Sequence, residues 1–187
     1  MSLTSYLIHA PIFAKTPADL QRAWAEMEAV KKANKAKSIG VSNYLQTHLE
    51  TTLATATIPP SINQIEYHPY LQHGNLLSYQ HSSANIATAA YGPLSAVTKA
   101  KPGPVDEYMA QLAKKYYVSE GEISLRWCMD QGVVAVTTSG KASRLSDYLR
   151  ATTFKLTLKE VDEIKRLGDT KHYRGFWNDK FAKDDRS

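Results

Sequence analysis

The chain has 187 residues, of which 43% are hydrophobic and 22% are charged, and its formal net charge is +5. This balance is typical of one soluble globular domain, spanning residues 1–187, and no apolar run approaches the roughly 18 to 20 residues of a membrane span. The basic residues are scattered rather than gathered in a stripe, which argues against a nucleic-acid partner and leaves an anionic ligand as a weak expectation.

The first half of the chain is predicted to alternate strands with helices. Residues 3–8 (Leu-Thr-Ser-Tyr-Leu-Ile) predict a buried strand whose start is less apolar than its end. Thr16-Pro17 then starts a helix that extends to Lys32, with the threonine as the cap and the proline at the first helical position. The elements expected next are a strand at 37–41, a helix beyond Ser42-Asn43 through Leu53, a strand at 62–66, a helix near 75–81 and a strand at 86–90.

The second half begins with a long loop expected at residues 92–104, and loops of that length in compact α/β units tend to be functional. Ser119 and Glu122 have the spacing of a capping box, as do Thr157 and Glu160. The elements expected here are helices at 105–116 and 120–130, a strand at 133–136, a helix from about 143 to 150 and a helix from the second capping box to 167. Residues 168–187 form an aromatic and charged tail without a clear period.

The only cysteine, Cys128, lies in the apolar pattern of the helix predicted at 120–130, and we expect it to be buried. A lone cysteine excludes an intramolecular disulfide and fits a reducing, cytoplasmic location. Residues 1–13 lack the pattern of a secretory signal, which agrees with that location.

The alternation of five strands with helices predicts parallel βα units and an α/β fold. On the alternation alone, the sheet fits either an open flavodoxin-like arrangement or part of a closed barrel. No Gly-x-Gly-x-x-Gly loop or P-loop follows a strand, so the common phosphate-binding loops are not expected. The histidines and the cysteine lack metal-site spacing, and no metal is expected either.

Distinctive polar and aromatic residues occur at the end of each predicted strand, which is where a (β/α)8 barrel carries its chemistry. The five segments are Leu7-Ile8-His9-Ala10-Pro11, Gly40-Val41-Ser42-Asn43, Asn63-Gln64-Ile65-Glu66-Tyr67-His68-Pro69, Ala90-Tyr91-Gly92-Pro93-Leu94 and Thr137-Thr138-Ser139-Gly140-Lys141. In this order, over about residues 5–167, the chain resembles the aldo-keto reductases. The last segment is similar to that of fungal members such as the conjugated polyketone and dehydropantolactone reductases.

The resemblance implies a partial (β/α)8 barrel, made of the last five βα units, a C-terminal helix and the tail. It also implies NADPH-dependent reduction of aldehydes and ketones to alcohols. His9 would be the histidine of the catalytic tetrad, which orients and polarises the substrate carbonyl. The cofactor contacts that it implies are Ser42, Asn43 and Gln64 on the nicotinamide carboxamide, Tyr91 stacked on the nicotinamide ring, and Gly92, Leu94, Thr138, Ser139, Lys141 and Arg144 farther along the cofactor.

Within that set, Ser139, Lys141 and Arg144 would bind the 2′-phosphate that distinguishes NADPH from NADH. This role has an independent physical basis, because two positive charges are added to a helix amino terminus that already favours anions. The Arg144 guanidinium also has the fork geometry for a bidentate contact with phosphate.

Other parts of the family's machinery are not matched. The tyrosine that acts as general acid, and the aspartate and lysine that tune it, precede the histidine strand in the family, whereas eight residues precede His9 here. A positioned general acid contributes about 10²–10⁴ in rate, so we expect weak or no turnover from this chain alone. Gly92 also stands where relatives often have serine, which removes one hydroxyl contact to the cofactor.

Several alternatives stay open on the sequence. A non-catalytic remnant that binds a nucleotide or a protein is the alternative to a reductase. Glu66 and His68 fall on one side of their strand, but we expect them to be structural rather than an independent acid–base pair. Phe176 and Trp177 either close over the pocket of a small carbonyl substrate or pack on the exterior. The open edges of the first and last strands predict self-association of the isolated chain.

Overall fold

The computed structural model describes residues 3–187, so the first two residues of the predicted domain lie outside the described part. Its five strands form one sheet in the order β1-β2-β3-β4-β5, and the pairs β1–β2 and β2–β3 are parallel. The strands are β1 (Leu3–Ile8), β2 (Ala36–Ser42), β3 (Ile62–Glu66), β4 (Ala87–Tyr91) and β5 (Val133–Ala135). The spatial order follows the chain order, as expected when each βα unit places its strand beside the preceding one.

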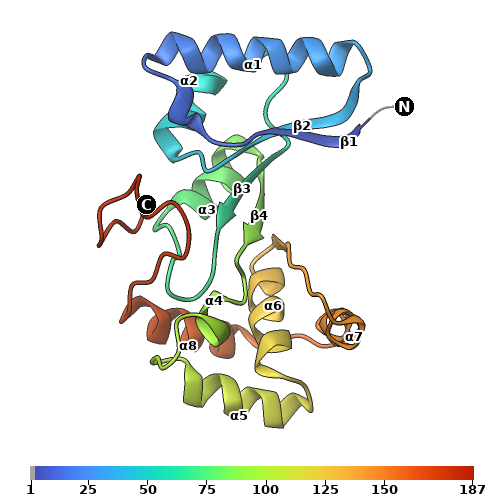
Figure 1. The fold of residues 1–187 in the computed structure, drawn as a ribbon, viewed down its shortest axis with the longest axis vertical. Coiled ribbons are helices and arrows are strands. Elements are labelled where there is room, and N and C mark those ends of the chain that lie inside the picture. Colours follow the sequence, from blue (N-terminus) through green and yellow to red (C-terminus); the bar gives the residue numbers. More distant parts are fainter. Residues whose placement is uncertain (1–2) are drawn as a thin grey trace. The chain divides into compact units, whose positions relative to one another are not determined.

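Helices connect the strands, as the alternation predicted (Figure 1). They are α1 (Pro17–Lys32), α2 (Gln46–Leu53), α3 (Leu76–Ser78), α4 (Ser95–Thr98), α5 (Asp106–Tyr116), α6 (Glu120–Asp130), α7 (Ala142–Arg150) and α8 (Leu158–Asp169), with a 3-10 turn at Pro11–Phe13 and a π-helical turn at Tyr79–Ala84. These helices and strands match the predicted ones with small shifts at their ends. The exceptions are the 3-10 turn at Pro11–Phe13, which was not predicted, and α4, which lies inside the segment predicted to be only a loop.

The chain folds as two compact units. Unit 1 contains the residues up to Ile65 together with Asn75–Thr88, and unit 2 contains Glu66–Gly74 and Ala89–Ser187. Strands β3 and β4 each begin in unit 1 and end in unit 2.

The core of unit 1 lies where α1 packs against α2 and β2. Trp24 of α1 is buried, and its indole Nε1–H donates to the Ile58 carbonyl at 2.9 Å. Glu28, one turn further along the same helix, is also buried and accepts from the backbone N–H groups of Thr57 and Ile58. The helix therefore fixes the segment before β3 through polar as well as apolar contacts.

The core of unit 2 is centred on α6, which packs against α5 and α8 (Figure 1). Trp127 stacks on Tyr67 with ring centroids 5.1 Å apart, and its Nε1–H donates to the Val161 carbonyl of α8 at 3.3 Å. Cys128 beside it is fully buried, as predicted, and burial raises the pKa of its thiol. Aromatic stacking and a satisfied indole make this the rigid centre of the unit.

Both predicted capping boxes are present. Ser119 N–H donates to Glu122 Oε2 at 2.8 Å, and Glu122 N–H donates to Ser119 Oγ at 3.3 Å. The same reciprocal pair joins Thr157 and Glu160 at the start of α8. Each box satisfies two of the helix N–H groups that have no intrahelical partner.

The prediction that residues 3–8 form a buried strand is half wrong. The strand has the predicted bounds, but Leu3 is 55% exposed and Tyr6 45% exposed. The reason is that β1 is at the edge of the sheet and, within residues 3–187, pairs only with β2. The sequence of a strand indicates which residues it is able to bury. It does not indicate whether a neighbouring element is present to cover them.

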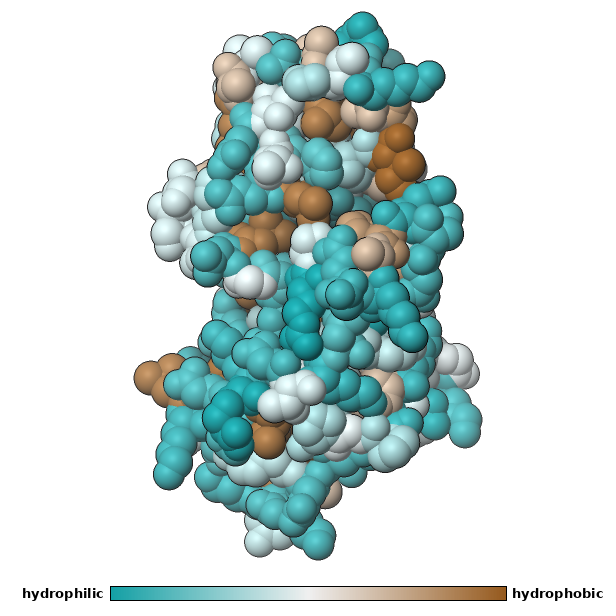
Figure 2. Space-filling model, turned by 90° about the vertical axis from the view of Figure 1, so that its left-hand side faces the viewer, coloured by the Kyte–Doolittle hydropathy of each residue, from teal (hydrophilic) through white to brown (hydrophobic). Residues whose placement is uncertain are grey.

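Over residues 3–187, no helix is both long enough and apolar enough to cross a membrane. On the face shown in Figure 2, hydrophobic residues form separate groups within a mainly hydrophilic surface.

Candidate functional site

In unit 1, the predicted residues at the ends of β1, β2 and β3 are joined by hydrogen bonds. The Ser42 hydroxyl donates to the Gln64 carbonyl at 2.6 Å. The Asn43 side-chain amide donates to the His9 carbonyl at 2.8 Å and contacts Ser42 Oγ at 3.1 Å. The structure therefore brings the backbone carbonyls of His9 and Gln64 together with the side chains of Ser42 and Asn43 near the carboxyl ends of these strands.

Asn43 sits at the turn that leaves β2. Its backbone is in the left-handed region, with φ of 61°, which asparagine tolerates better than most residues. Its N–H donates to the Gln64 carbonyl at 2.9 Å, so this carbonyl accepts from both Ser42 and Asn43. Two donors on one carbonyl fix the direction of the turn and the position of the Asn43 amide.

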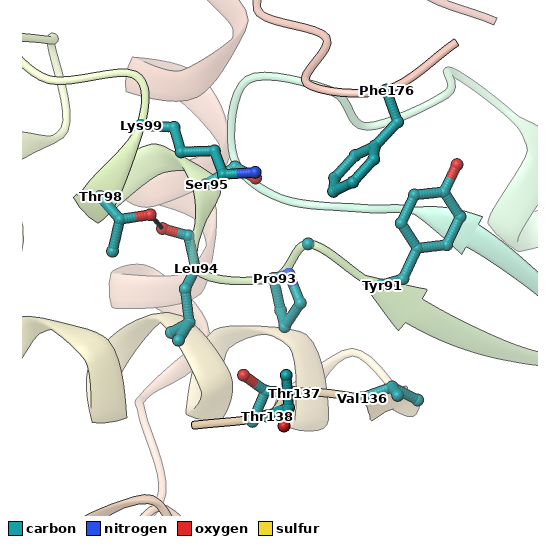
Figure 3. A pocket seen from close by; sticks show the side chains of 11 residues that line it. Tyr91, Pro93, Leu94, Ser95, Thr98, Lys99, Val136, Thr137, Thr138 and Phe176 are labelled. Atoms are coloured by element: carbon teal, nitrogen blue, oxygen red, sulfur yellow. Dashed lines mark hydrogen bonds between the residues drawn. The ribbon is translucent and has the colours of Figure 1, made fainter. Parts of the chain in front are cut away.

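Unit 2 contains a pocket of about 400 Å³ after β4 (Figure 3). Four of the predicted cofactor contacts line it, namely Tyr91, Gly92, Leu94 and Thr138. The other lining residues are Pro93, Ser95, Thr98, Lys99, Val136, Thr137 and Phe176. The pocket therefore combines an aromatic wall, several hydroxyl groups and one ammonium.

The aromatic wall is formed by Tyr91 and Phe176, whose rings meet edge to face with centroids 5.3 Å apart (Figure 3). Burial raises the pKa of the Tyr91 hydroxyl to about 12, and the nearby charge of Glu66 acts in the same direction. A hydrogen bond with the Trp177 side chain works against that shift. Tyr91 is therefore protonated throughout the physiological range and contributes a neutral ring.

The polar side of the pocket was not predicted in detail. Lys99 Nζ lies 4.6 Å from the centroid of the Phe176 ring, in cation–π geometry. Thr98 Oγ1 donates to the Leu94 carbonyl at 2.7 Å, which fixes one of the hydroxyl groups (Figure 3). Ser95 and Thr98 belong to α4, and Lys99 follows it directly. This helix has a single turn, which is too short to show a period in the sequence.

Gly92 has φ of +64° and lies against the aromatic wall. A Cβ added here would lie 3.3 Å from the Phe176 ring and 3.2 Å from Ser95 Oγ. Both the backbone conformation and the available space therefore favour glycine at this position.

The remaining predicted contacts lie outside the residues that line the pocket. Lys141 is the N-cap of α7, and its N–H donates to Ser139 Oγ at 3.1 Å. Arg144 is exposed in the first turn of the same helix, and its N–H donates to the Lys141 carbonyl at 3.1 Å. The structure thus places all three at one strand-to-helix turn, as predicted, with the two charged side chains directed to solvent.

Glu66 and His68 do fall on the same side of the chain, as the alternation predicted. Both are fully buried, and His68 Nε2 lies 3.1 Å from Glu66 Oε1. Glu66 also accepts from the backbone of the C-terminal tail, and the His68 ring lies against Tyr173 of the tail, contacts that no sequence pattern indicated. Among residues 3–187, no group of three or more histidine, cysteine, aspartate or glutamate side chains is placed to hold a metal ion.

Comparisons with known proteins identify the relatives. The Aldo/keto reductase family matches residues 3–169. An NADPH-dependent alpha-keto amide reductase of Saccharomyces cerevisiae is 39% identical over 186 residues, which cover 95% of this chain and 60% of the yeast protein. An NAD/NADP-dependent indole-3-acetaldehyde reductase of Schizosaccharomyces pombe is 37% identical, over 93% of this chain and 62% of that protein.

Solved structures agree. An aldo-keto reductase enzyme from a deep-sea metagenome library superposes with a TM-score of 0.82 at 29% identity, over 92% of this chain and 62% of that one. A Bombyx mori aldo-keto reductase in complex with NADP gives 0.79 at 32% identity, over 89% of this chain and 57% of that one. The chain thus spans about three-fifths of the length of these relatives, and its five-stranded sheet is part of their barrel. The chain belongs to the aldo/keto reductase family.

Proposed function

We propose that residues 1–187 form the cofactor-binding part, as a single domain, of an NADPH-dependent reductase that converts aldehydes or ketones to alcohols. The observation that carries the proposal is the pocket after β4, where Tyr91 offers a neutral aromatic face beside hydroxyl groups and Lys99. The family match over residues 3–169 supports it, as do the NADPH-dependent yeast relative and the silkworm relative in complex with NADP.

The residues present fit such a cofactor. When bound, NADPH supplies a hydride to the carbonyl carbon of the substrate. In unit 2, Tyr91 would stack on the nicotinamide, while Gly92, Leu94 and Thr138 would line the channel. In unit 1, the resemblance to the family implies that Ser42, Asn43 and Gln64 hold a carboxamide group and that His9 donates a hydrogen bond to a carbonyl oxygen.

The turn at the start of α7 would bind the 2′-phosphate. Ser139, Lys141 and Arg144 lie together there, and both charged side chains are exposed and directed to solvent. A dianionic phosphate at this turn would meet two cations and the positive end of the helix dipole. The proposal therefore predicts that NADPH is preferred over NADH.

The test is a fluorescence titration of the purified chain with NADPH and with NADH. Arg144→Ala should weaken NADPH binding roughly tenfold, the effect of one lost charge-assisted contact, and leave NADH binding unchanged. Arg166→Ala is the matched control, because Arg166 is an exposed arginine of α8 that pairs with Glu163. Equal losses for both nucleotides would contradict the assignment of the phosphate site.

Turnover is tested separately, by following NADPH oxidation in the presence of a reactive dicarbonyl. Binding with turnover would identify the chain as a reductase of small carbonyl compounds. Binding without turnover would favour the alternative, a nucleotide-binding remnant of the family. Failure to bind either nucleotide would refute the cofactor role of these residues.

A further inference from the structure

We infer that Glu66 is a positioning residue, which anchors the C-terminal tail so that Phe176 forms a wall of the pocket. Glu66 is the last residue of β3, and its side chain is fully buried within unit 2. A buried carboxylate needs hydrogen-bonding partners to offset its loss of hydration. Its partners are therefore informative about what the residue does.

Two of these partners come from the tail. The N–H groups of Gly175 and Phe176 donate to Glu66 Oε1 at 2.7 Å and to Oε2 at 3.2 Å. Successive backbone amides thus meet the two oxygens of one carboxylate, which fixes both the position and the direction of this short segment. Gly175 itself fits closely, since a Cβ there would lie 3.1 Å from Glu66 Oε1.

The third partner, His68, holds the carboxylate in place. The Tyr70 N–H donates to His68 Nδ1 at 3.2 Å, so Nδ1 is an acceptor and the ring proton lies on Nε2. Nε2 then donates to Glu66 Oε1 at 3.1 Å. All three partners are donors, which matches the acceptor-only chemistry of a carboxylate.

The anchor determines where the Phe176 side chain goes. With its N–H bound to Glu66, the ring stands edge-on to Tyr91 and lies under the Lys99 ammonium (Figure 3). Gly92 gives it room, because a Cβ at that position would approach both the Phe176 ring and Glu66 Cγ. Glu66 thus acts on the pocket through Phe176, and the meaning of that wall for cofactor binding rests on the proposed function.

Tail position is measured without activity, in two ways. Trypsin cleaves after Arg174, next to the anchored amides, and its rate follows the population of released tail. Acrylamide quenching of tryptophan fluorescence reports mainly on Trp177, because Trp24 and Trp127 are buried. In Glu66→Gln, a side-chain NH2 replaces one acceptor and faces a donor, so released tail should rise roughly tenfold or more.

The matched control is Glu160→Gln. Glu160 is also a buried carboxylate of unit 2, but its partners are Thr157, Lys115 and Tyr116 rather than the tail. If Glu66 anchors the tail, the control should leave trypsin cleavage after Arg174 and Trp177 quenching as in the unchanged chain. Equal increases in both variants would show general destabilisation and overturn the inference, as would a folded Glu66→Gln with unchanged cleavage and quenching.

A second variant disturbs the anchor from the tail side, should Glu66→Gln fail to fold. Gly175→Val places a branched side chain against Glu66 Oε1 and replaces no fully buried residue. It should raise cleavage and quenching in the same direction, and the absence of any increase would overturn the inference.

The link to the pocket is tested by a double-mutant cycle on the dissociation constant of NADPH. If Glu66 acts through the Phe176 ring, the double variant Glu66→Gln with Phe176→Ala should bind no more weakly than the weaker single variant. Fully additive losses would overturn the link. If the unchanged chain does not bind NADPH, the proposed function fails. Trypsin cleavage and acrylamide quenching would still show whether Glu66 anchors the tail.

Discussion

Glu28 shows how a single buried carboxylate ties two segments of unit 1 together. Burial alone would raise its pKa, but hydrogen bonds from the Thr57 hydroxyl, from the Ile58 and Thr57 N–H groups and from Lys32 outweigh burial and lower the pKa to about 2. The ionised form of Glu28 is therefore more favourable in the folded chain than in the unfolded chain. As a result, the contribution of Glu28 to the free energy of unfolding depends on pH.

The sign of that dependence follows from the lowered pKa. The contribution of Glu28 to the free energy of unfolding is complete at neutral pH and is lost as the pH falls from about 4.5 towards about 2. It should amount to about 3 kcal/mol. Urea unfolding of the unchanged chain and of Glu28→Gln at pH 6.5 and 3.5 measures it. Glu28→Gln should be less stable than the unchanged chain at pH 6.5. The difference in free energy of unfolding between the two should be smaller at pH 3.5. A constant gap would contradict this account.

Cys128 makes a second residue-scale prediction. Its thiol is fully buried, and burial raises its pKa, so the reactive thiolate is scarce in the folded chain. A thiol reagent such as Ellman's reagent should react with the folded chain only as fast as the chain opens. In guanidinium chloride it should react at once, with the single cysteine of the sequence. Fast reaction of the folded chain would contradict the burial of Cys128 in α6.

At the scale of the element, α8 docks in unit 2 through a glycine. A Cβ on Gly168 would lie 2.1 Å from the Pro69 carbonyl oxygen, which is a backbone atom, so the main chain itself would have to shift. Gly168→Ala should therefore lower the free energy of unfolding by about 1–3 kcal/mol, the usual cost of overpacking. Gly140→Ala is the control, since nothing lies within 4 Å of a Cβ there. Similar effects of the two substitutions, measured by urea unfolding, would refute the close docking.

Elements whose boundaries are set by adjacent residues were predictable from the sequence. The boxes at Ser119 and Thr157 start α6 and α8 where expected, because the partners lie three residues apart. The four residues of α4 were missed, since one helical turn is too short to show a period. The exposure of β1 was also missed, because burial depends on the neighbouring strand rather than on the strand itself.

The candidate site divides in the same way. Strand-end residues such as Asn43 and Tyr91 could be singled out because they stand where predicted strands end, and the resemblance to the family implied their roles. The contact of Glu66 with Gly175 joins residues 109 positions apart and leaves no local pattern. Phe176 was noted as an aromatic residue of the tail, yet its place beside Tyr91 follows from that distant contact.

At the scale of the whole molecule, β1 leaves one edge of the sheet open. Among the described residues it pairs only with β2, and Tyr6 is exposed on it. An exposed, apolar edge strand pairs readily with another chain. The apparent molar mass measured by sedimentation equilibrium should therefore rise with protein concentration. The charged side chain in Tyr6→Lys should weaken the association and reduce this rise. Tyr117→Lys, at an exposed tyrosine outside the sheet, is the control. A monomer at all concentrations would contradict the prediction.

The path of the chain through the two units limits where the protein can be cut into fragments. The backbone passes from one unit to the other three times, after Ile65, after Gly74 and after Thr88. A fragment that stops at Ile65 therefore lacks the stretch Asn75–Thr88, which completes unit 1, and no single cut yields both units whole. Split-protein reporters and exchanges of segments between homologous genes should accordingly keep residues 62–91 in one piece.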